Sequence, residues 1–296
     1  MQLNYTTVLQ QVESDISLRG MSEHTITEYV PKIRKFLEYI GKPIENLSEL
    51  DFRVYLEYLN NHSKLAPSTI NVHNSAIRFF FEITLDKNIN YKRVPRKKDP
   101  IKLPVAFTTE EISAFIDTID DIRYKAIFTT IYASGLRLSE IRRLRVQDID
   151  SKQMRLFIYQ GKGKRDRWVP LSYYSLICLR HYFKEYKPNH PSGYLFLNRD
   201  FSNCISERAI QDAFRKYHSR ANIQTYGTVH TLRHSYATHQ LESGVNVFFI
   251  QKILGHATLW TTMRYLRISV TDVIKTKSPL DSLYSVPNDE EGNSHD

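Results

Sequence analysis

The sequence predicts a mainly α-helical protein with one small antiparallel β-sheet. Apolar residues recur at helical spacing through most of the 296 residues, as in helices that bury one face. Residues 154–159 instead alternate apolar and polar side chains, and the turn GKGKRD joins them to RWVPL, which is the pattern of a β-hairpin. Between two helical regions, residues 86–106 carry three prolines, which favour an extended connection.

The N-terminal region is predicted to form four or five helices and no strand. Residues 4–18 form the first helix, and the second begins at the N-cap candidate Ser22 and runs to Gly41. Pro31 is predicted to kink or break this second helix. A third helix covers residues 48–60 and a fourth follows Pro67. Residues 1–88 are therefore expected to form one helical domain.

A second domain is predicted from Phe107, where Thr108 and Glu111 form a capping box that opens a helix. The next helix covers residues 121–134 and ends at Gly135. We expect this domain to span 107–284 and the acidic residues 285–296 to be disordered. After the hairpin it is expected to hold helices at 172–185, 206–219, 229–242, 246–254, 259–266 and 270–275.

The charge indicates a polyanionic partner, with double-stranded DNA as the first candidate. The formal net charge is +9 and the pI is about 9.3. The predicted linker, residues 89–106, is rich in cations that would bind phosphates, although a solvated linker with no partner would have the same composition. We expect DNA contacts from two places, the linker and the hairpin turn, through Lys92, Arg93, Arg96, Lys97, Lys98, Lys164 and Arg165.

Other classes of protein find little support in the sequence. The two cysteines, Cys178 and Cys204, fit neither a disulfide framework nor a zinc-ligand spacing. His230 and His234 stand four residues apart, as in zinc hydrolases, but no glutamate follows His230. No signal peptide and no apolar run of ~18 residues appears. We therefore expect a cytoplasmic protein with no membrane segment, metal or cofactor.

Six residues of the second domain suit the chemistry of a phosphodiester. Arginine presents a planar fork of donors that matches two phosphate oxygens. A lysine on a glycine-rich hairpin tip can reach into a DNA groove and deliver a proton. Taken singly, each residue would be expected at an ordinary surface or core position, and Glu140 could orient the first arginine or merely flank it. The six are Arg137, Lys162, His230, Arg233, His256 and Tyr265.

In order and spacing, these residues resemble the pattern of the tyrosine recombinases, or phage-type integrases. That pattern is an Arg after Gly-x with Ser-Glu following, a Lys in a G-K-G hairpin, H-x-x-R, L-G-H, and a Tyr nine residues later. The resemblance covers nearly the whole chain. It implies a helical, SAM-like core-binding domain and an α-rich catalytic domain, which together form a C-shaped clamp on DNA.

The resemblance also implies a mechanism of strand cleavage and rejoining that needs neither metal nor ATP. Tyr265 attacks a backbone phosphate to give a 3′-phosphotyrosyl bond, while Arg137 and Arg233 hold the non-bridging oxygens. His230 accepts the tyrosine proton and Lys162 protonates the departing 5′-oxygen. His256 either hydrogen-bonds the phosphate or steadies the tyrosine.

The family further implies a tetramer on DNA, of identical subunits or with a paralogue, in which residues 268–284 pass to a neighbouring subunit. The cellular role remains open between integration, excision and resolution of chromosome dimers. Two alternatives are a type IB topoisomerase-like enzyme that relaxes DNA and a DNA-binding protein without catalytic activity.

Overall fold

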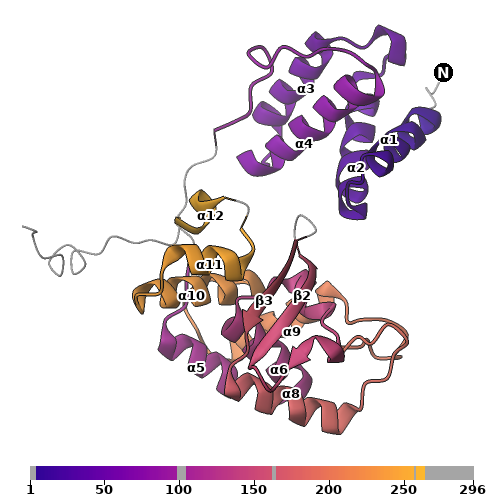
Figure 1. The fold of residues 1–296 in the computed structure, drawn as a ribbon. Helices are drawn as coiled ribbons and strands as arrows, with labels where there is room; N and C mark the ends of the chain where they lie inside the picture. Colours follow the sequence, from indigo (N-terminus) through magenta and orange to yellow (C-terminus); the bar gives the residue numbers. More distant parts are fainter. Residues whose placement is uncertain (1–4, 99–104, 162–164, 257, 264–296) are drawn as a thin grey trace, which may run out of the picture. The chain divides into compact units, whose positions relative to one another are not determined.

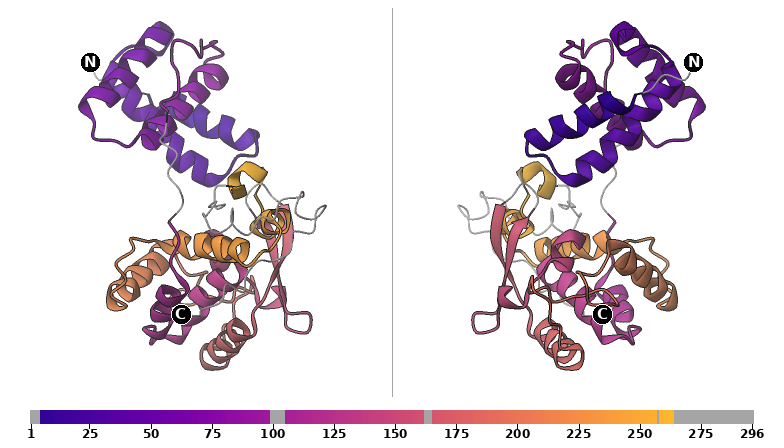
Figure 2. Two further views of the ribbon diagram at one scale, coloured as in Figure 1. Left: turned by 90° about the vertical axis from the view of Figure 1, so that its left-hand side faces the viewer. Right: turned by 90° about the vertical axis from the view of Figure 1, so that its right-hand side faces the viewer.

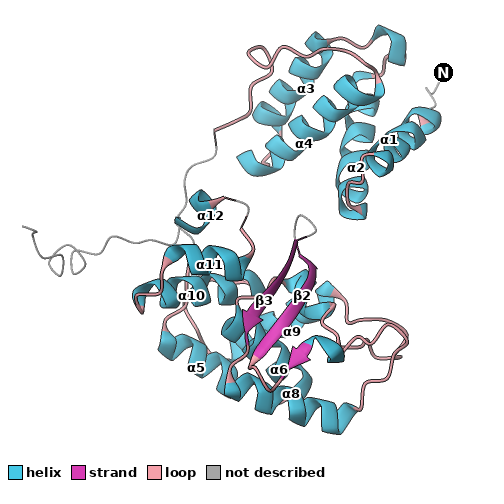
Figure 3. Ribbon diagram, viewed as in Figure 1, coloured by secondary structure: helices cyan, strands magenta, loops and turns pink. Residues whose placement is uncertain are grey.

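The computed structural model describes residues 5–98, 105–161, 165–256 and 258–263 (Figure 1). The chain divides into two compact units, Met1–Lys102 and Leu103–Asp296. Helices dominate both units, and the strands of the described residues form one antiparallel sheet in the second (Figure 3). The expected mainly α fold with a small antiparallel sheet is confirmed.

Two helices of the first unit, the second and the third, begin at serine residues that cap them. The Ser22 hydroxyl accepts a hydrogen bond from the Thr25 amide, and Ser48 forms a capping box with Asp51. A 3₁₀ turn at Ile44–Asn46 precedes the third helix, and a π-helical turn at Phe80–Thr84 extends the fourth. The α-helices are α1 (Thr6–Leu18), α2 (Glu23–Ile40), α3 (Glu49–His62) and α4 (Pro67–Phe79).

Helix α2 continues through Pro31, so the break considered from the sequence does not occur. Proline inside a helix costs ~3 kcal/mol, because it removes one backbone hydrogen bond and crowds the preceding turn. Val30, Ile33 and Phe36 on α2 are buried in the core of this unit, on both sides of the proline. Their burial offsets the cost and keeps the helix intact.

The first unit extends beyond residue 88, where the linker was expected to begin. The Val94 side chain is buried in its core, and the Arg78 guanidinium donates to the Val94 carbonyl. The Asn74 amide donates to the Pro95 carbonyl (3.1 Å), and Asn71 exchanges two hydrogen bonds with the Lys97 backbone (2.9 Å each). Polar side chains of α4 thus satisfy the backbone of this proline-containing segment, which charge and proline content alone did not predict.

The second unit is built around α6, which packs against both α8 and α10. A 3₁₀ turn at Val146–Asp148 leads into the sheet. Its helices are α5 (Thr109–Asp117), α6 (Ile122–Ser134), α7 (Leu138–Arg142), α8 (Tyr173–Tyr186), α9 (Glu207–Arg220), α10 (Val229–Glu242), α11 (Val247–Leu254) and α12 (Leu259–Met263).

The sheet has the order β1 (Ile149–Asp150), β2 (Arg155–Gly161) and β3 (Arg165–Pro170), all antiparallel. Leu156 pairs with Val169, and both side chains are buried. Trp168, the neighbour of Val169 on β3, points to the opposite face of the sheet and is exposed. Strand β3 lies beside α11, so the β-hairpin packs against the helices of the second unit at α11 (Figures 1 and 2). No helix in the described part of the chain has the length and hydrophobicity needed to cross a membrane.

Candidate active site

The structure brings three of the six predicted catalytic residues, Arg137, Arg233 and His256, together near the buried carboxylate of Glu140. Arg137 is the N-cap of α7, Arg233 lies in α10, and His256 follows the end of α11. The predicted catalytic residues Lys162 and Tyr265, and the predicted DNA contact Lys164, lie outside the described residues.

Glu140 holds the arginines in place. Its carboxylate accepts from Arg137 Nη1 (2.8 Å) and from both terminal nitrogens of Arg167 (2.9 and 2.8 Å), and Arg233 Nη1 lies 3.8 Å away. Burial alone would raise the pKa of Glu140, but the hydrogen bonds and charge of Arg167, followed by those of Arg137, lower it to about 2. The carboxylate is therefore ionised at neutral pH, and it orients Arg137 rather than merely flanking it.

Arg137 owes its position to the turn that ends α6. Gly135 has a φ of +62°, and a Cβ at this position would lie 2.6 Å from the Tyr236 ring, so both conformation and space favour glycine. Besides its bond to Glu140, Arg137 donates from Nη2 to the Gly255 carbonyl (3.0 Å). These bonds use two of its five N–H groups, and 15% of the side chain remains exposed. The guanidinium can therefore still donate to an anion.

Arg233 ties two helix ends together. Its side chain is only 4% exposed, and it donates to the carbonyls of Gly135 and Leu254 (2.6 Å each). These oxygens stand at the C-terminal ends of α6 and α11, where the helix dipole favours a cation. The residue therefore fixes the turn before Arg137 relative to the turn before His256.

His256 connects Arg233 to the helix that precedes the predicted nucleophile. Its Nε2 lies 3.1 Å from Arg233 Nη2 and its Nδ1 lies 2.8 Å from the Thr262 hydroxyl on α12. An arginine can only donate, so Nε2 accepts and Nδ1 carries the proton donated to Thr262. Burial, and then the charge of Arg233, lowers the pKa of His256 to about 3, which agrees with a neutral ring. Of its two suggested roles, this arrangement favours steadying the tyrosine segment.

His230 lies in the first turn of α10, three residues before Arg233, and its side chain is exposed. Desolvation by the surrounding protein is the main cause that lowers its pKa, and the positive charge of Arg233 comes second. A neutral imidazole can accept a proton, as the expected role of a general base requires.

Arg167 was missed by the sequence reasoning, although it joins the hairpin to the cluster. Besides its two bonds to Glu140, its Nε donates to the Ile253 carbonyl (2.6 Å) at the end of α11. It shares a face of β3 with the buried Val169 and pairs across the sheet with the buried Ile158. A single arginine at an inward strand position indicates a buried ion pair, and this signal could have identified it.

The predicted DNA-contacting cations of residues 92–98 lie in the first unit. Arg93 lies 3.7 Å from Glu49, Arg96 donates to the Ser75 hydroxyl (3.1 Å), and Lys97 donates to the Asn60 side chain. Arg93 and Arg96 remain exposed, as do Lys92, Lys97 and Lys98. Arg165, on the hairpin, begins strand β3 of the second unit.

His239, in the same helix as His230 and His234, shares a hydrogen bond with the Tyr132 hydroxyl (2.9 Å). Within the residues that the structure describes, no three His, Cys, Asp or Glu side chains are grouped so that they could hold a metal ion.

Comparison with known proteins gives two family matches. Residues 106–271 match the phage integrase family, and residues 8–91 match the SAM-like N-terminal domain of phage integrases. A putative integrase/recombinase of Sinorhizobium fredii is 37% identical over 283 residues, which are 95% of this chain and 91% of that protein. The tyrosine recombinase XerA of Pyrococcus horikoshii is 31% identical over 265 residues, covering 88% and 89%.

Among solved structures, the fold is similar to that of the XerH site-specific recombinase bound to its palindromic difH substrate. The TM-score is 0.72 at 21% identity, and the match covers 90% of this chain and 82% of that one.

Proposed function

The chain belongs to the phage integrase family as a tyrosine recombinase, and we propose that it recombines DNA at specific sites through a covalent bond between Tyr265 and a backbone phosphate. The observation that carries this proposal is the surplus of positive charge around Glu140. Three guanidinium groups, those of Arg137, Arg167 and Arg233, face this single carboxylate. Two positive charges remain in a partly dry site, which suits a phosphate that gains a second negative charge during attack.

The arginines supply electrostatic stabilisation. Arg137 and Arg233 hold the non-bridging oxygens of the scissile phosphate, and Glu140 together with Arg167 fixes their orientation before DNA arrives. Because the donors are already ordered, little reorganisation is needed as charge develops. Each donor of this kind contributes roughly 10²–10³ in rate. Cations fixed in this way take the place that Mg²⁺ has in other phosphoryl transfers.

Proton transfer is divided between two residues. A phenol has a pKa of about 10, so Tyr265 needs a base, and the neutral His230 serves as that base. Lys162 is the acid that protonates the departing 5′-oxygen, so that it leaves as a neutral hydroxyl and not as an alkoxide. His256 holds Thr262, three residues before Tyr265, and so restrains the approach of the nucleophile.

Strand exchange completes the reaction. The phosphotyrosyl bond conserves the energy of the broken phosphodiester, and the 5′-hydroxyl of a second duplex attacks it to form the recombined strand and release Tyr265. Two duplexes present four scissile strands, so we propose a tetramer on DNA in which residues 268–284 reach a neighbouring subunit. The helical N-terminal domain and the exposed cations of residues 92–98 bind the flanking duplex.

The test uses a duplex selected in vitro for binding to the full-length protein, nicked so that cleavage releases a short strand. The wild-type protein should form a denaturant-stable protein–DNA adduct in the presence of EDTA. Tyr265→Phe should bind the same DNA with unchanged affinity and form no adduct, while the control Tyr226→Phe, at a tyrosine that is 82% exposed, should react normally. Relaxation of supercoiled DNA without exchange between two duplexes would instead identify a topoisomerase.

A further inference from the structure

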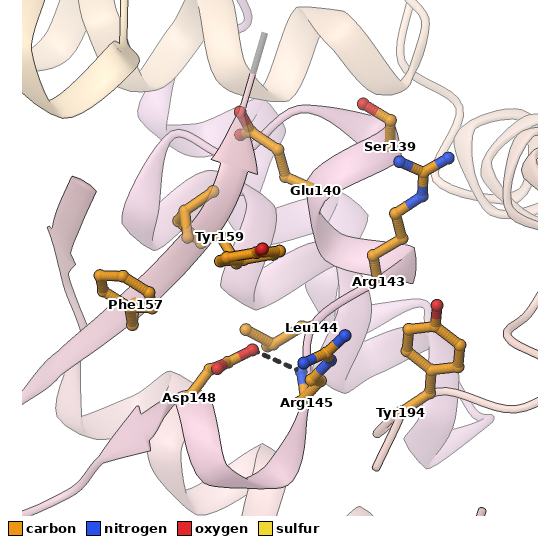
Figure 4. A pocket seen from close by; sticks show the side chains of 10 residues that line it. Ser139, Glu140, Arg143, Leu144, Arg145, Asp148, Phe157, Tyr159 and Tyr194 are labelled. Carbon is orange, nitrogen blue, oxygen red and sulfur yellow. Dashed lines mark hydrogen bonds between the residues drawn. The ribbon is translucent and has the colours of Figure 1, made fainter. Parts of the chain in front are cut away.

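A second basic pocket lies next to the arginine cluster, and none of the proposed catalytic steps uses it. The cavity has a volume of about 260 Å³ and lies between α7, the loop that follows it, strand β2 and Tyr194 (Figure 4). Glu140 lines one edge of this cavity, so the cavity and the cluster share a wall. Its polar and charged lining comes mainly from Ser139, Arg143, Arg145, Asp148, Tyr159 and Tyr194.

The two arginines of this pocket have no carboxylate partner within salt-bridge distance among the described residues. Arg143 is exposed, and Figure 4 shows its guanidinium next to the Ser139 hydroxyl. Arg145 is half-buried, with its guanidinium carbon 5.7 Å from the centre of the Tyr159 ring and 6.0 Å from that of Tyr194. The rings hold Arg145 against the cavity wall while leaving its donors without a charged acceptor.

Both acidic side chains of the pocket already accept hydrogen bonds. Glu140 is bound by Arg137 and Arg167, as described above. Asp148 accepts from the Arg145 backbone amide (3.0 Å), and burial raises the pKa of its carboxyl. One buried carboxylate therefore faces two guanidinium groups, and the pocket keeps a surplus of positive charge.

We propose that this pocket binds a second phosphate of the DNA backbone, distinct from the scissile phosphate held by Arg137 and Arg233. Arg143 and Arg145 provide charged donors and Ser139 a hydroxyl, which together match the oxygens of a phosphodiester. The inference rests on the proposed function only in taking DNA as the ligand.

The spacing of the two sites suits one DNA strand. Arg137 and Arg143 bracket α7, whose five residues extend about 7–8 Å. Arg143 therefore lies within reach of a phosphate close to the scissile one on the same strand, and a contact there fixes the register of the strand in the active site.

The experiment measures the affinity of the full-length protein for a short duplex of arbitrary sequence over a range of salt concentrations. The variants are Arg143→Gln and Arg145→Gln, and the matched control is Arg208→Gln, at an arginine of the same unit whose side chain is 90% exposed. Loss of one phosphate contact lowers the slope of log affinity against log salt by about 0.9. The ratio of wild-type affinity to variant affinity should therefore fall about 3.5-fold when the salt concentration rises fourfold.

The proposal is overturned if both pocket variants keep the wild-type slope and affinity, or if they lose affinity by the same factor at every salt concentration. A carboxylate-bearing protein segment as the true occupant would give the first of these results. Compared with Gln, Lys at either position should restore most of the salt dependence but not the full affinity. Lysine keeps the positive charge but lacks the two parallel N–H donors of the guanidinium. Because the readout is binding, failure of the proposed cleavage chemistry would leave these results unchanged and would appear separately, as absence of the covalent adduct.

Discussion

Replacing Glu140 by Gln should destabilise the second unit by about 3 kcal/mol. Its folded-state pKa of about 2, against an ordinary 4.5, corresponds to this free energy at 1.36 kcal/mol per unit. The side chain is 4% exposed, so solvent screens little of this interaction. The figure agrees with the 3–5 kcal/mol expected when one partner of a buried ion pair is removed. Glutamine keeps the shape but leaves three arginines facing a neutral amide.

Urea unfolding followed by tryptophan fluorescence is a suitable assay, because both tryptophans, Trp168 and Trp260, lie in the second unit. The control is Glu207→Gln, which removes an exposed partner of Arg142 and should cost less than about 1 kcal/mol. Because the pKa of Glu140 is lowered by folding, its contribution is fully present above pH 4.5 and is lost as the pH falls towards 2. Equal stability of Glu140→Gln and wild type at pH 7 would refute the reasoning.

Three further predictions concern the reaction. Thr262→Val removes the acceptor of the His256 Nδ1–H and should slow single-turnover cleavage about 10-fold with DNA affinity unchanged; weakened binding with normal cleavage would contradict this. Lys162→Met should slow cleavage by roughly 10²–10⁴, and a substrate with sulfur in place of the 5′-oxygen should restore it, because a thiolate leaves without protonation. Because the pKa of His230 is lowered, wild-type cleavage should persist below the pH at which an ordinary histidine is protonated. The cleavage rate should still fall at lower pH, and His230→Ala should abolish this fall in the pH–rate profile.

The helices and the candidate site could be predicted from the sequence where the signal is local. Capping residues such as Ser22, Ser48 and Thr108 mark helix starts because each satisfies a nearby amide. The two site arginines were recognised from the short motifs around Arg137 and Arg233, and the structure places their side chains on one carboxylate.

What the sequence did not predict depends on contacts between distant residues. Arg167 meets Glu140, 27 positions earlier, only because the hairpin folds back beside α11. Val94 is buried in the first unit and Arg78 of α4 donates to its carbonyl, and charge and proline content alone do not indicate these contacts. Pro31 illustrates the same limit. The local effect of proline predicts a kink or a break, whereas core packing keeps helix α2 continuous.

The most direct test of the account identifies the atom that joins protein to DNA. The adduct formed on the nicked duplex is digested with protease and nuclease, and the peptide that carries the nucleotide is sequenced by mass spectrometry. The account predicts a 3′-phosphate linked to the oxygen of Tyr265 and a free 5′-hydroxyl on the released strand. A linkage to any other residue, or to a 5′-phosphate, would contradict it.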